Sequence, residues 1–364
     1  MNIDDIQKKI RALRPIEDAQ LRDLPFEGSD LSKAVFMRTD FQGQSFVNCT
    51  LDSTTFVDCD LQGARFSGGQ ISQMTCSGSK LQGATFERVK LHECNFIDSG
   101  LQGVSFSNVR LERCMVTRCN LDQSGWARVT GESCAFLESS LEGATMHTVE
   151  LSSFVLNEID FAKIDFLGLS FDRGLLLQCG FVRCDLTSCR FTAATLNESD
   201  FREADLRGMQ LEGCGFQRSS FEDADLRDCV ANRALFTETT LDRARFDGAS
   251  LEACQFGKAR AEDVSFVGSK LEKSRWTEAR LHRCDLSRAD VRHSNFSHAH
   301  LTDCRFDGAN LTAANFHEMV HEGVSWRNTS KKYSSGTNEK QSEAESGPAG
   351  ARKRPVTRPV DQWR

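Results

Sequence analysis

Residues 204–208 read Ala-Asp-Leu-Arg-Gly, and residues 224–228 read Ala-Asp-Leu-Arg-Asp. The same five-residue frame extends in both directions without an insertion. Positions ending in 1 or 6 from Leu21 to Trp326 form a series of 62, of which 57 are Leu, Phe, Ile, Val, Met or Trp. This series contains 25 of the 26 phenylalanines. A period of five matches neither a helix nor a strand, so it indicates a backbone that turns a corner in every repeat.

A second series lies two residues before each large apolar residue. From Ser29 to Val324, 52 of these 60 positions are Ala, Cys, Ser, Thr, Gly or Val. Each repeat is therefore small–polar–large–polar–polar, with the small and large side chains facing inward and the other three facing water. The period itself shows inward-facing positions and regular corners, and we expect successive turns of the chain to hydrogen-bond at strand spacing, about 4.8 Å.

The two quoted segments and residues 309–313, Ala-Asn-Leu-Thr-Ala, resemble the A(D/N)LXX motif of the pentapeptide-repeat family. The resemblance implies an all-β fold, a right-handed quadrilateral β-helix of about 15 coils with four repeats to a coil. We expect an N-terminal helical cap over residues 1–25, the β-helix over residues 26–328 and a disordered tail over residues 329–364. Expected core residues are Phe66, Leu81, Phe86, Leu206, Phe246 and Leu311.

The two ends of the chain differ in pattern. The first residues predict an amphipathic helix, because apolar side chains recur at helical spacing after Asn2. Such a helix would cover the first coil, whose open strand edge otherwise invites aggregation. From Ser330 onward the sequence is polar and contains Gly, Ser and Pro, which predicts disorder. Trp363 in this tail is a candidate docking residue. The apolar residues of the expected helix are Ile3, Ile6, Ile10 and Leu13.

The cysteines and histidines predict no metal or disulfide site. Fourteen of the 15 cysteines occupy the small inward position, and Cys76 occupies the large one. This placement favours packing, as a small apolar residue would pack, and CxxC pairs are absent. Six of the eight histidines lie between His282 and His321. We expect His298 and His317 to point into solvent, and we expect no cofactor.

Catalysis is not expected either. Acidic groups such as Glu222 and Asp223 lie at outward positions on convex faces. General acid–base chemistry needs a concave, desolvated pocket. We therefore predict no catalytic residues and no enzyme activity.

Two features are candidate interaction sites. The first is a column of glutamines that repeats every 20 residues, each followed by glycine, which suits a corner with positive φ. The second is the segment 151–176, where four consecutive small positions become large and one cross-section must hold eight bulky side chains. We expect this coil to widen, kink or turn Val155 and Leu175 outward, dividing the coil stack in two. The residues concerned are Gln42, Gln62, Gln82 and Gln102 in the column and Phe154, Ile159, Ile164 and Leu169 in the segment.

Charge favours a protein partner over nucleic acid. Residues 21–330 carry 33 basic and 44 acidic side chains, a net charge of −11, and the tail 331–364 carries +4. A general nucleic-acid binder needs a basic stripe. No apolar run is long enough for a membrane span, and the N-terminus lacks a secretory apolar segment, so we expect a cytoplasmic protein.

The resemblance leaves three functions open. The first is a non-enzymatic bacterial scaffold or adaptor for another protein, favoured in a type VI secretion setting. The second is a DNA mimic that binds DNA gyrase, as the quinolone-resistance members of the family do, and the third is a secreted effector. A homodimer through the C-terminal coil or through residues 151–176 is a further alternative for the partner.

Overall fold

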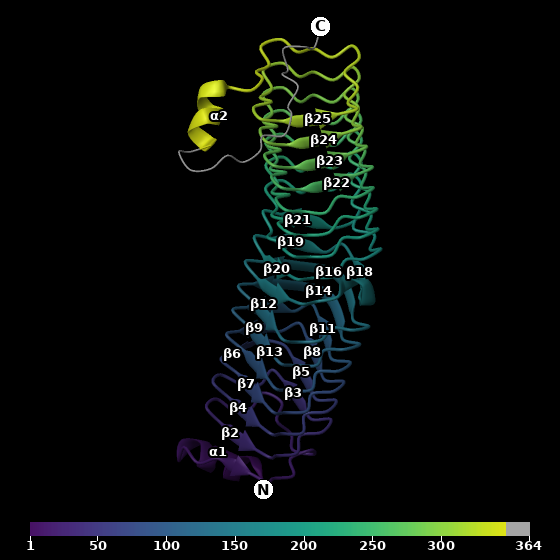
Figure 1. The fold of residues 1–364 in the computed structure, drawn as a ribbon. Helices are drawn as coiled ribbons and strands as arrows, with labels where there is room; N and C mark the ends of the chain where they lie inside the picture. The colour runs from purple at the N-terminus through teal and green to yellow at the C-terminus, as the bar shows by residue number, and fades with distance from the viewer. Residues whose placement is uncertain (347–364) are drawn as a thin grey trace. The chain divides into compact units, whose positions relative to one another are not determined.

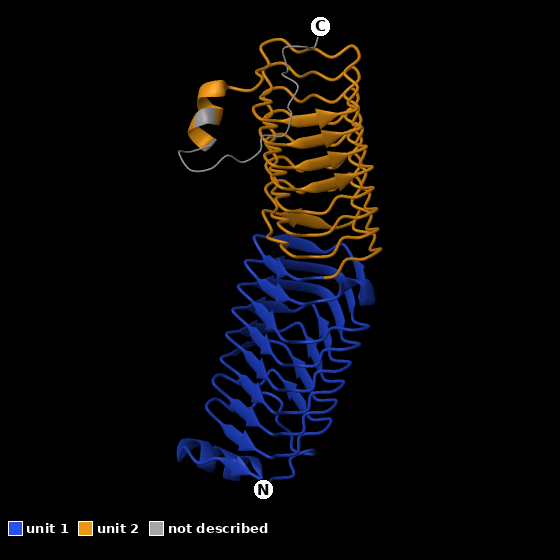
Figure 2. Ribbon diagram, in the orientation of Figure 1, with its two compact units in different colours: residues 1–179 blue, residues 180–364 orange. Residues whose placement is uncertain are grey.

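The computed structural model describes residues 1–346, and the chain forms two compact units, residues 1–179 and 180–364 (Figure 2). Each unit is a stack of coils of parallel β-structure (Figure 1). Residues 20 apart in sequence lie side by side, as Phe66 does with Phe86 in unit 1 and Asp205 with Asp225 in unit 2. The predicted right-handed quadrilateral β-helix, with four repeats to a coil, is confirmed.

Backbone hydrogen bonds between coils hold this fold together. The Leu61 N–H donates to the Lys80 carbonyl at 2.7 Å, and the Lys80 N–H donates to the Cys59 carbonyl at 2.9 Å. A proline in such a ladder would remove a donor, which explains why the five prolines lie outside residues 26–347.

In most repeats one left-handed residue makes the corner. Every non-glycine residue with positive φ stands at a position ending in 3 or 8, for example Arg118 at 49° and Asp223 at 59°. Gly63 takes a φ of 66°, and the Ala64 N–H closes its turn onto the Leu61 carbonyl at 3.0 Å. The period of five in the sequence is thus the period of the corners.

Unit 1 contains one helix, α1 (Ile3–Arg11), and two groups of strands. The nine-stranded sheet consists, in spatial order, of β1 (Ile16–Glu17), β2 (Val35–Met37), β4 (Thr55–Val57), β7 (Thr75–Ser77), β10 (Asn95–Ile97), β13 (Met115–Thr117), β15 (Ala135–Leu137), β17 (Val155–Asn157) and β20 (Leu175–Leu177). The other strands of unit 1 are β3 (Ser45–Val47), β5 (Arg65–Ser67), β6 (Gln70–Ser72), β8 (Thr85–Glu87), β9 (Lys90–His92), β11 (Ser105–Ser107), β12 (Arg110–Glu112), β14 (Gly125–Glu132), β16 (Thr145–Ser152), β18 (Asp165–Leu167) and β19 (Ser170–Asp172).

Helix α1 begins with a reciprocal cap. The Asn2 side chain accepts a hydrogen bond from the Asp5 N–H at 2.9 Å, and the Asp5 carboxylate accepts one from the Asn2 N–H. Ile6 is fully buried, and the Gln7 amide bonds the Asp30 carbonyl of the coils. The expectation for Leu13 was wrong. Its φ is 51° and its side chain is 80% exposed, because the helix ends at Arg11 and the chain turns before Pro15.

Unit 2 has fewer strands than unit 1. Most of its coil sides pair through a single bridge, such as Thr195 with Gly215. One side forms a four-stranded parallel sheet, β22-β23-β24-β25. The elements are β21 (Arg190–Thr192), β22 (Arg260–Glu262), β23 (Arg280–His282), β24 (His300–Thr302), β25 (Val320–Glu322) and the helix α2 (Glu339–Ser346).

The expectation of disorder from residue 329 needs correction for residues 329–346. The coils continue through the bridges of Ser330 with Asn310 and of Ser335 with Asn315, and α2 follows. These residues lack the apolar pattern that predicts packing, and polar contacts hold them to the coils instead. Residues 347–364, and with them Trp363, lie outside the described part of the chain.

The interior consists of stacked columns. The side chains of Phe46, Phe66, Phe86 and Phe106 stack at centroid distances of 4.7 to 5.1 Å, and Trp126 continues the column at 4.4 Å. All 15 cysteines are buried and none forms a disulfide. The six residues expected in the core are fully buried: Phe66, Leu81, Phe86, Leu206, Phe246 and Leu311.

The segment 151–176 departs from the regular coil. Residues Phe161–Lys163 form a 3-10 turn, and the Gly143 N–H donates to the Lys163 carbonyl, one residue beyond the usual register. The four bulky residues at small positions, Phe154, Ile159, Ile164 and Leu169, are all buried.

Two adjustments relieve the crowding. A Cβ atom on Gly174 would lie 2.2 Å from the ring of Phe154, so this glycine makes room for the ring. Phe166, at a core position, is only partly buried, and the neighbouring Leu167 is 60% exposed. Leu175 is 42% exposed, as expected, whereas Val155 is half-buried.

Candidate functional site

The outward face of the nine-stranded sheet in unit 1 carries no charge from β2 to β20. In each strand the middle residue points into the core, and the first and third point outward. Because 27% of the residues of the chain are charged, sixteen positions with average composition would carry about four charges. We call these residues the uncharged face: Val35, Met37, Thr55, Val57, Thr75, Ser77, Asn95, Ile97, Met115, Thr117, Ala135, Leu137, Val155, Asn157, Leu175 and Leu177.

The uncharged face is also largely apolar and open to solvent. Val35 is 38% exposed, Met115 is 43% exposed and Leu175 is 42% exposed. The remaining members are half-buried, because side chains on neighbouring coils cover one another at strand spacing. Contiguous apolar surface of this kind marks interaction sites on soluble proteins.

The face along β9 and β12 differs sharply from the uncharged face. It carries Glu112, which forms ion pairs with Lys90 and with Arg110, each at 2.7 Å. Charged side chains are therefore compatible with strands of this solenoid, and their absence from one face is a property of that face.

Charged residues at the corners border the uncharged face, and most of these are paired. Arg118 contacts Asp98 at 2.7 Å, and Arg113 contacts Glu93 at 3.3 Å. The Arg118 guanidinium lowers the pKa of the Asp98 carboxyl by donating hydrogen bonds to it. The border is thus polar but locally neutralised.

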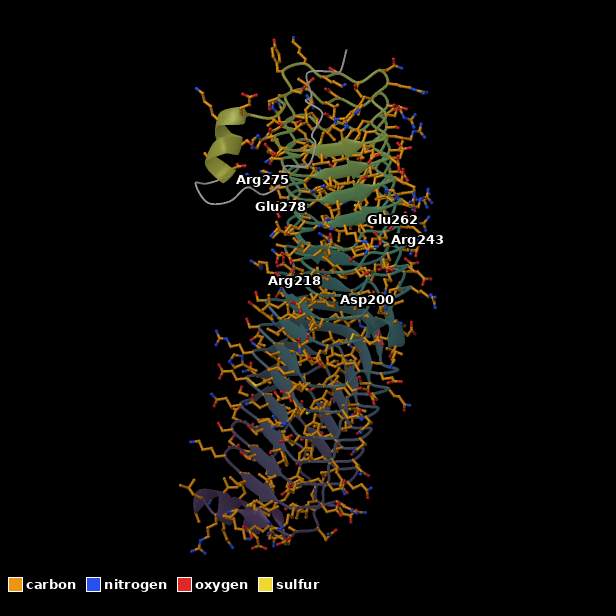
Figure 3. The ribbon with its side chains drawn as sticks, viewed as in Figure 1. Asp200, Arg218, Arg243, Glu262, Arg275 and Glu278 are labelled. Carbon is orange, nitrogen blue, oxygen red and sulfur yellow. The ribbon has the colours of Figure 1, made fainter. Side chains whose placement is uncertain are left out.

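Unit 2 presents mixed charge. Arg218 lies between Glu198 at 3.4 Å and Glu238 at 3.1 Å, and Arg243 contacts Asp223 at 2.7 Å. Figure 3 labels Arg218 and Arg243 together with Asp200, Glu262, Arg275 and Glu278 on this unit. Acidic and basic side chains alternate along its coils.

The helix α2 covers part of unit 2 through polar contacts. His317 is 1% exposed, so the expectation that it points into solvent was wrong. Its Nδ1 accepts a hydrogen bond from the Asn338 N–H at 3.0 Å, and its Nε2 lies 3.3 Å from the Glu345 carboxylate. His298 Nε2 lies 3.2 Å from the same carboxylate and is part-exposed.

In the expected column of glutamines, one hydrogen bond joins two of the side chains. Gln42 Nε2 donates to Gln62 Oε1 at 3.4 Å. The Oε1 atoms of Gln82 and Gln102 are buried without a hydrogen-bond partner. The glycines that follow these glutamines have φ of 64° to 69°, so the repeated pair serves the corner geometry.

Two hollows open on the surface of unit 1. One, of about 300 Å³, lies where Gly131 takes the place of a large residue between Leu111 and Leu151. The other, of about 460 Å³, lies beside the 3-10 turn and is lined by Glu142, Ile159 and Lys163, among others. Carboxylates that line the two hollows, such as Glu132, Glu150 and Glu142, are exposed to solvent.

The chain belongs to the pentapeptide-repeat family. A family model described as a pentapeptide repeat region matches residues 19–96 and 154–228. A second, described as pentapeptide repeats (8 copies), matches residues 219–257, 262–297 and 292–319. A search of the curated proteins found no match.

Solved structures with a similar fold include QnrB1 and HetL. QnrB1, a plasmid-mediated fluoroquinolone resistance protein, is 21% identical, covers 54% of this chain and 87% of its own, and has a TM-score of 0.37. HetL, a pentapeptide repeat protein involved in heterocyst differentiation regulation from the cyanobacterium Nostoc sp. strain PCC 7120, is 16% identical, covers 92% and 94%, and has a TM-score of 0.17. Similarity at this level identifies no shared function.

Sequence reasoning missed the uncharged face, although the sequence contains its signal. The outward residues of one coil side recur every 20 residues, and between residues 35 and 177 none of those on this side is charged. Separating the outward positions into four columns would have found it. Within the described residues, none of the helices is long and apolar enough to cross a membrane.

Proposed function

We propose that the protein is a non-enzymatic scaffold that binds another folded protein through the uncharged face of unit 1. The observation that carries this proposal is the run of sixteen outward positions without a charge on eight neighbouring strands. Removing apolar surface from water favours association by roughly 25 cal/mol per Å². No charge on the face has to be desolvated when a partner binds.

The same observation defines the chemistry of the partner. A carboxylate or ammonium group pressed against this face would lose its hydration and find no opposite charge, which costs several kcal/mol. The face has no Lys or Arg to neutralise phosphates, which disfavours nucleic acid and anionic lipid. The partner surface is therefore flat, apolar and uncharged where it meets the strands.

Charge distribution favours a scaffold over a DNA mimic. Imitation of B-DNA needs an uninterrupted row of anionic groups. In unit 2 the acids alternate with arginines that pair with them, as Arg243 does with Asp223 and Arg183 with Glu203. Family members of this length suggest a bacterial type VI secretion setting, which we propose as the place to look for the partner.

The test introduces one charge on the face. Met115→Glu places a carboxylate at the first position of β13, and we expect at least tenfold weaker binding of a partner identified with the wild-type protein. The control Ser105→Glu places the same charge at the first position of β11, on another face, and should leave the affinity unchanged. Calorimetry with the purified partner gives both values.

Other outcomes of this experiment would contradict the proposal or identify a different kind of partner. A partner bound equally well by both variants would show that the uncharged face is not the docking surface. Self-association that Met115→Glu abolishes in sedimentation would make the occupant a second copy of the chain. Binding to neutral phospholipid vesicles, lost in the same variant, would replace the protein partner by a membrane.

A further inference from the structure

Three side chains able to bind a metal meet where α2 lies against unit 2. The Nε2 atoms of His298 and His317 lie 3.2 and 3.3 Å from the same Glu345 oxygen. The three donor atoms all lie within 4.8 Å of one another. Each comes from a different segment: His298 and His317 stand on adjacent coils, and Glu345 stands on α2.

The spacing suits a tetrahedral ion. Zinc bonds to imidazole nitrogen and carboxylate oxygen are about 2.0–2.2 Å long, so their donor atoms stand roughly 3.3 Å apart. Both nitrogen–oxygen distances already have this value. The coil backbone fixes the two histidines relative to each other, since the His298 N–H donates to the His317 carbonyl at 2.9 Å. A movement of the part-exposed His298 ring brings its nitrogen into the set.

We propose that His298, His317 and Glu345 form a binding site for a first-row divalent transition metal such as Zn²⁺. Two imidazoles and one carboxylate select this class of ion, because Ca²⁺ and Mg²⁺ prefer oxygen ligands throughout. Glu345 and the part-exposed His298 leave the fourth coordination position open to solvent. The bound ion joins α2 to two coils of unit 2.

Metal binding has a consequence for the segment before α2. With Nδ1 of His317 accepting the Asn338 N–H, the ring proton stands on Nε2 and points at Glu345. A metal on Nε2 moves this proton to Nδ1, so two N–H donors then face each other. The hydrogen bond from Asn338 breaks, and the residues just before α2 shift while Glu345 stays in place.

The experiment uses the full-length protein after treatment with a chelator. We expect calorimetric titration with ZnCl₂ to show one ion per chain, and Co²⁺ to give the visible absorption of a four-coordinate site. His298→Asn and Glu345→Gln should each weaken Zn²⁺ binding at least tenfold. Both residues are part-exposed, so the coils should unfold as in the wild type. His300→Asn, on β24 and outside the cluster, is the matched control.

A second measurement follows the chain itself. Zn²⁺ should slow amide exchange in α2 and speed it at Asn338, and this effect should be lost in His298→Asn. The absence of stoichiometric Zn²⁺ binding would overturn the proposal. Binding that His298→Asn and Glu345→Gln leave unchanged would overturn it as well, since the ion would then lie elsewhere.

Discussion

Phe86 and Glu87 are neighbours in the chain, and the wall of the coil separates their side chains. Phe86 is fully buried and stacks on Phe66 at 4.7 Å and on Phe106 at 5.1 Å. Glu87 faces solvent and pairs with Arg65 at 2.9 Å. Two consecutive residues thus differ completely in their surroundings: Phe86 packs in the core, and Glu87 forms an ion pair at the surface.

We expect Phe86→Asp to lower the free energy of unfolding by several kcal/mol. It removes a stacked ring, and it buries a carboxylate that has no partner. Glu87→Lys should cost no more than about 1 kcal/mol, because exposed ion pairs contribute little. Urea unfolding of both variants measures the difference. Similar losses in the two variants would contradict the assignment of inward and outward positions.

For single residues, the sequence predicts well whether a side chain points inward or outward. It predicts poorly which neighbouring residue makes room for a side chain that is too large. Inward positions can be predicted because every repeat places its small and its large residue in the same core. The sequence also shows that Phe154 is too large for its position. It does not show that Gly174 receives the ring, since this depends on the rotamer of Phe154 and on stacking between coils 20 residues apart.

At the scale of elements, α1 protects the first coil. Its cap by Asn2 and Asp5 orders the first turn, and Ile6 is the one residue of the helix that is fully buried. Without the helix, the unpaired edge of the first coil would be available to another chain.

We therefore expect Ile6→Asp to cause self-association as well as a loss of stability. A carboxylate at this position cannot remain buried without a partner, so the helix leaves the coil and exposes the edge. Sedimentation velocity should show oligomers that grow with protein concentration. Lys8→Gln, on the exposed side of α1, should stay like the wild type. A monomeric Ile6→Asp protein would show that α1 is not needed to cover the edge.

The two helices differ in how far the sequence predicts them. For α1, apolar spacing and the Asn2 cap are local signals. For α2, the residues Glu339–Ser346 offer no apolar stripe, and the helix is held by contacts of Glu345 and Asn338 with His317. These tertiary contacts join positions more than 20 residues apart, which no local pattern reveals. The histidine cluster was missed for the same reason.

At the scale of the whole molecule, cysteine thiols form a large part of the small side chains in the core. All 15 thiols are buried, and they pack as small apolar side chains among the phenylalanine and leucine columns. The position of 14 of them in the small series, and of Cys76 in the large one, made this packing predictable from the sequence. Burial raises the pKa of Cys59, Cys179 and Cys214, because it disfavours the thiolate.

Stability should therefore fall in alkaline solution. Burial raises the pKa of Cys59 and that of Cys214 from 9.0 to about 11 each. Below about pH 9 both the folded and the unfolded chain keep these protons, and the full stability is present. Between pH 9 and 11 only the unfolded chain loses them, so the free energy of unfolding falls by about 1.4 kcal/mol per pH unit for each thiol.

Urea unfolding from pH 7.5 to 10.5 measures this slope, and a Cys59→Ala, Cys214→Ala variant isolates the two thiols. Lysine and tyrosine titrate in the same range, but they do so equally in both proteins, so the difference between the two slopes belongs to the cysteines. We expect the variant to lose stability less steeply above pH 9, by about 2.7 kcal/mol per pH unit if both thiols ionise only on unfolding. Parallel slopes would mean that these thiols reach solvent in the folded protein, which their burial in the small inward positions does not allow.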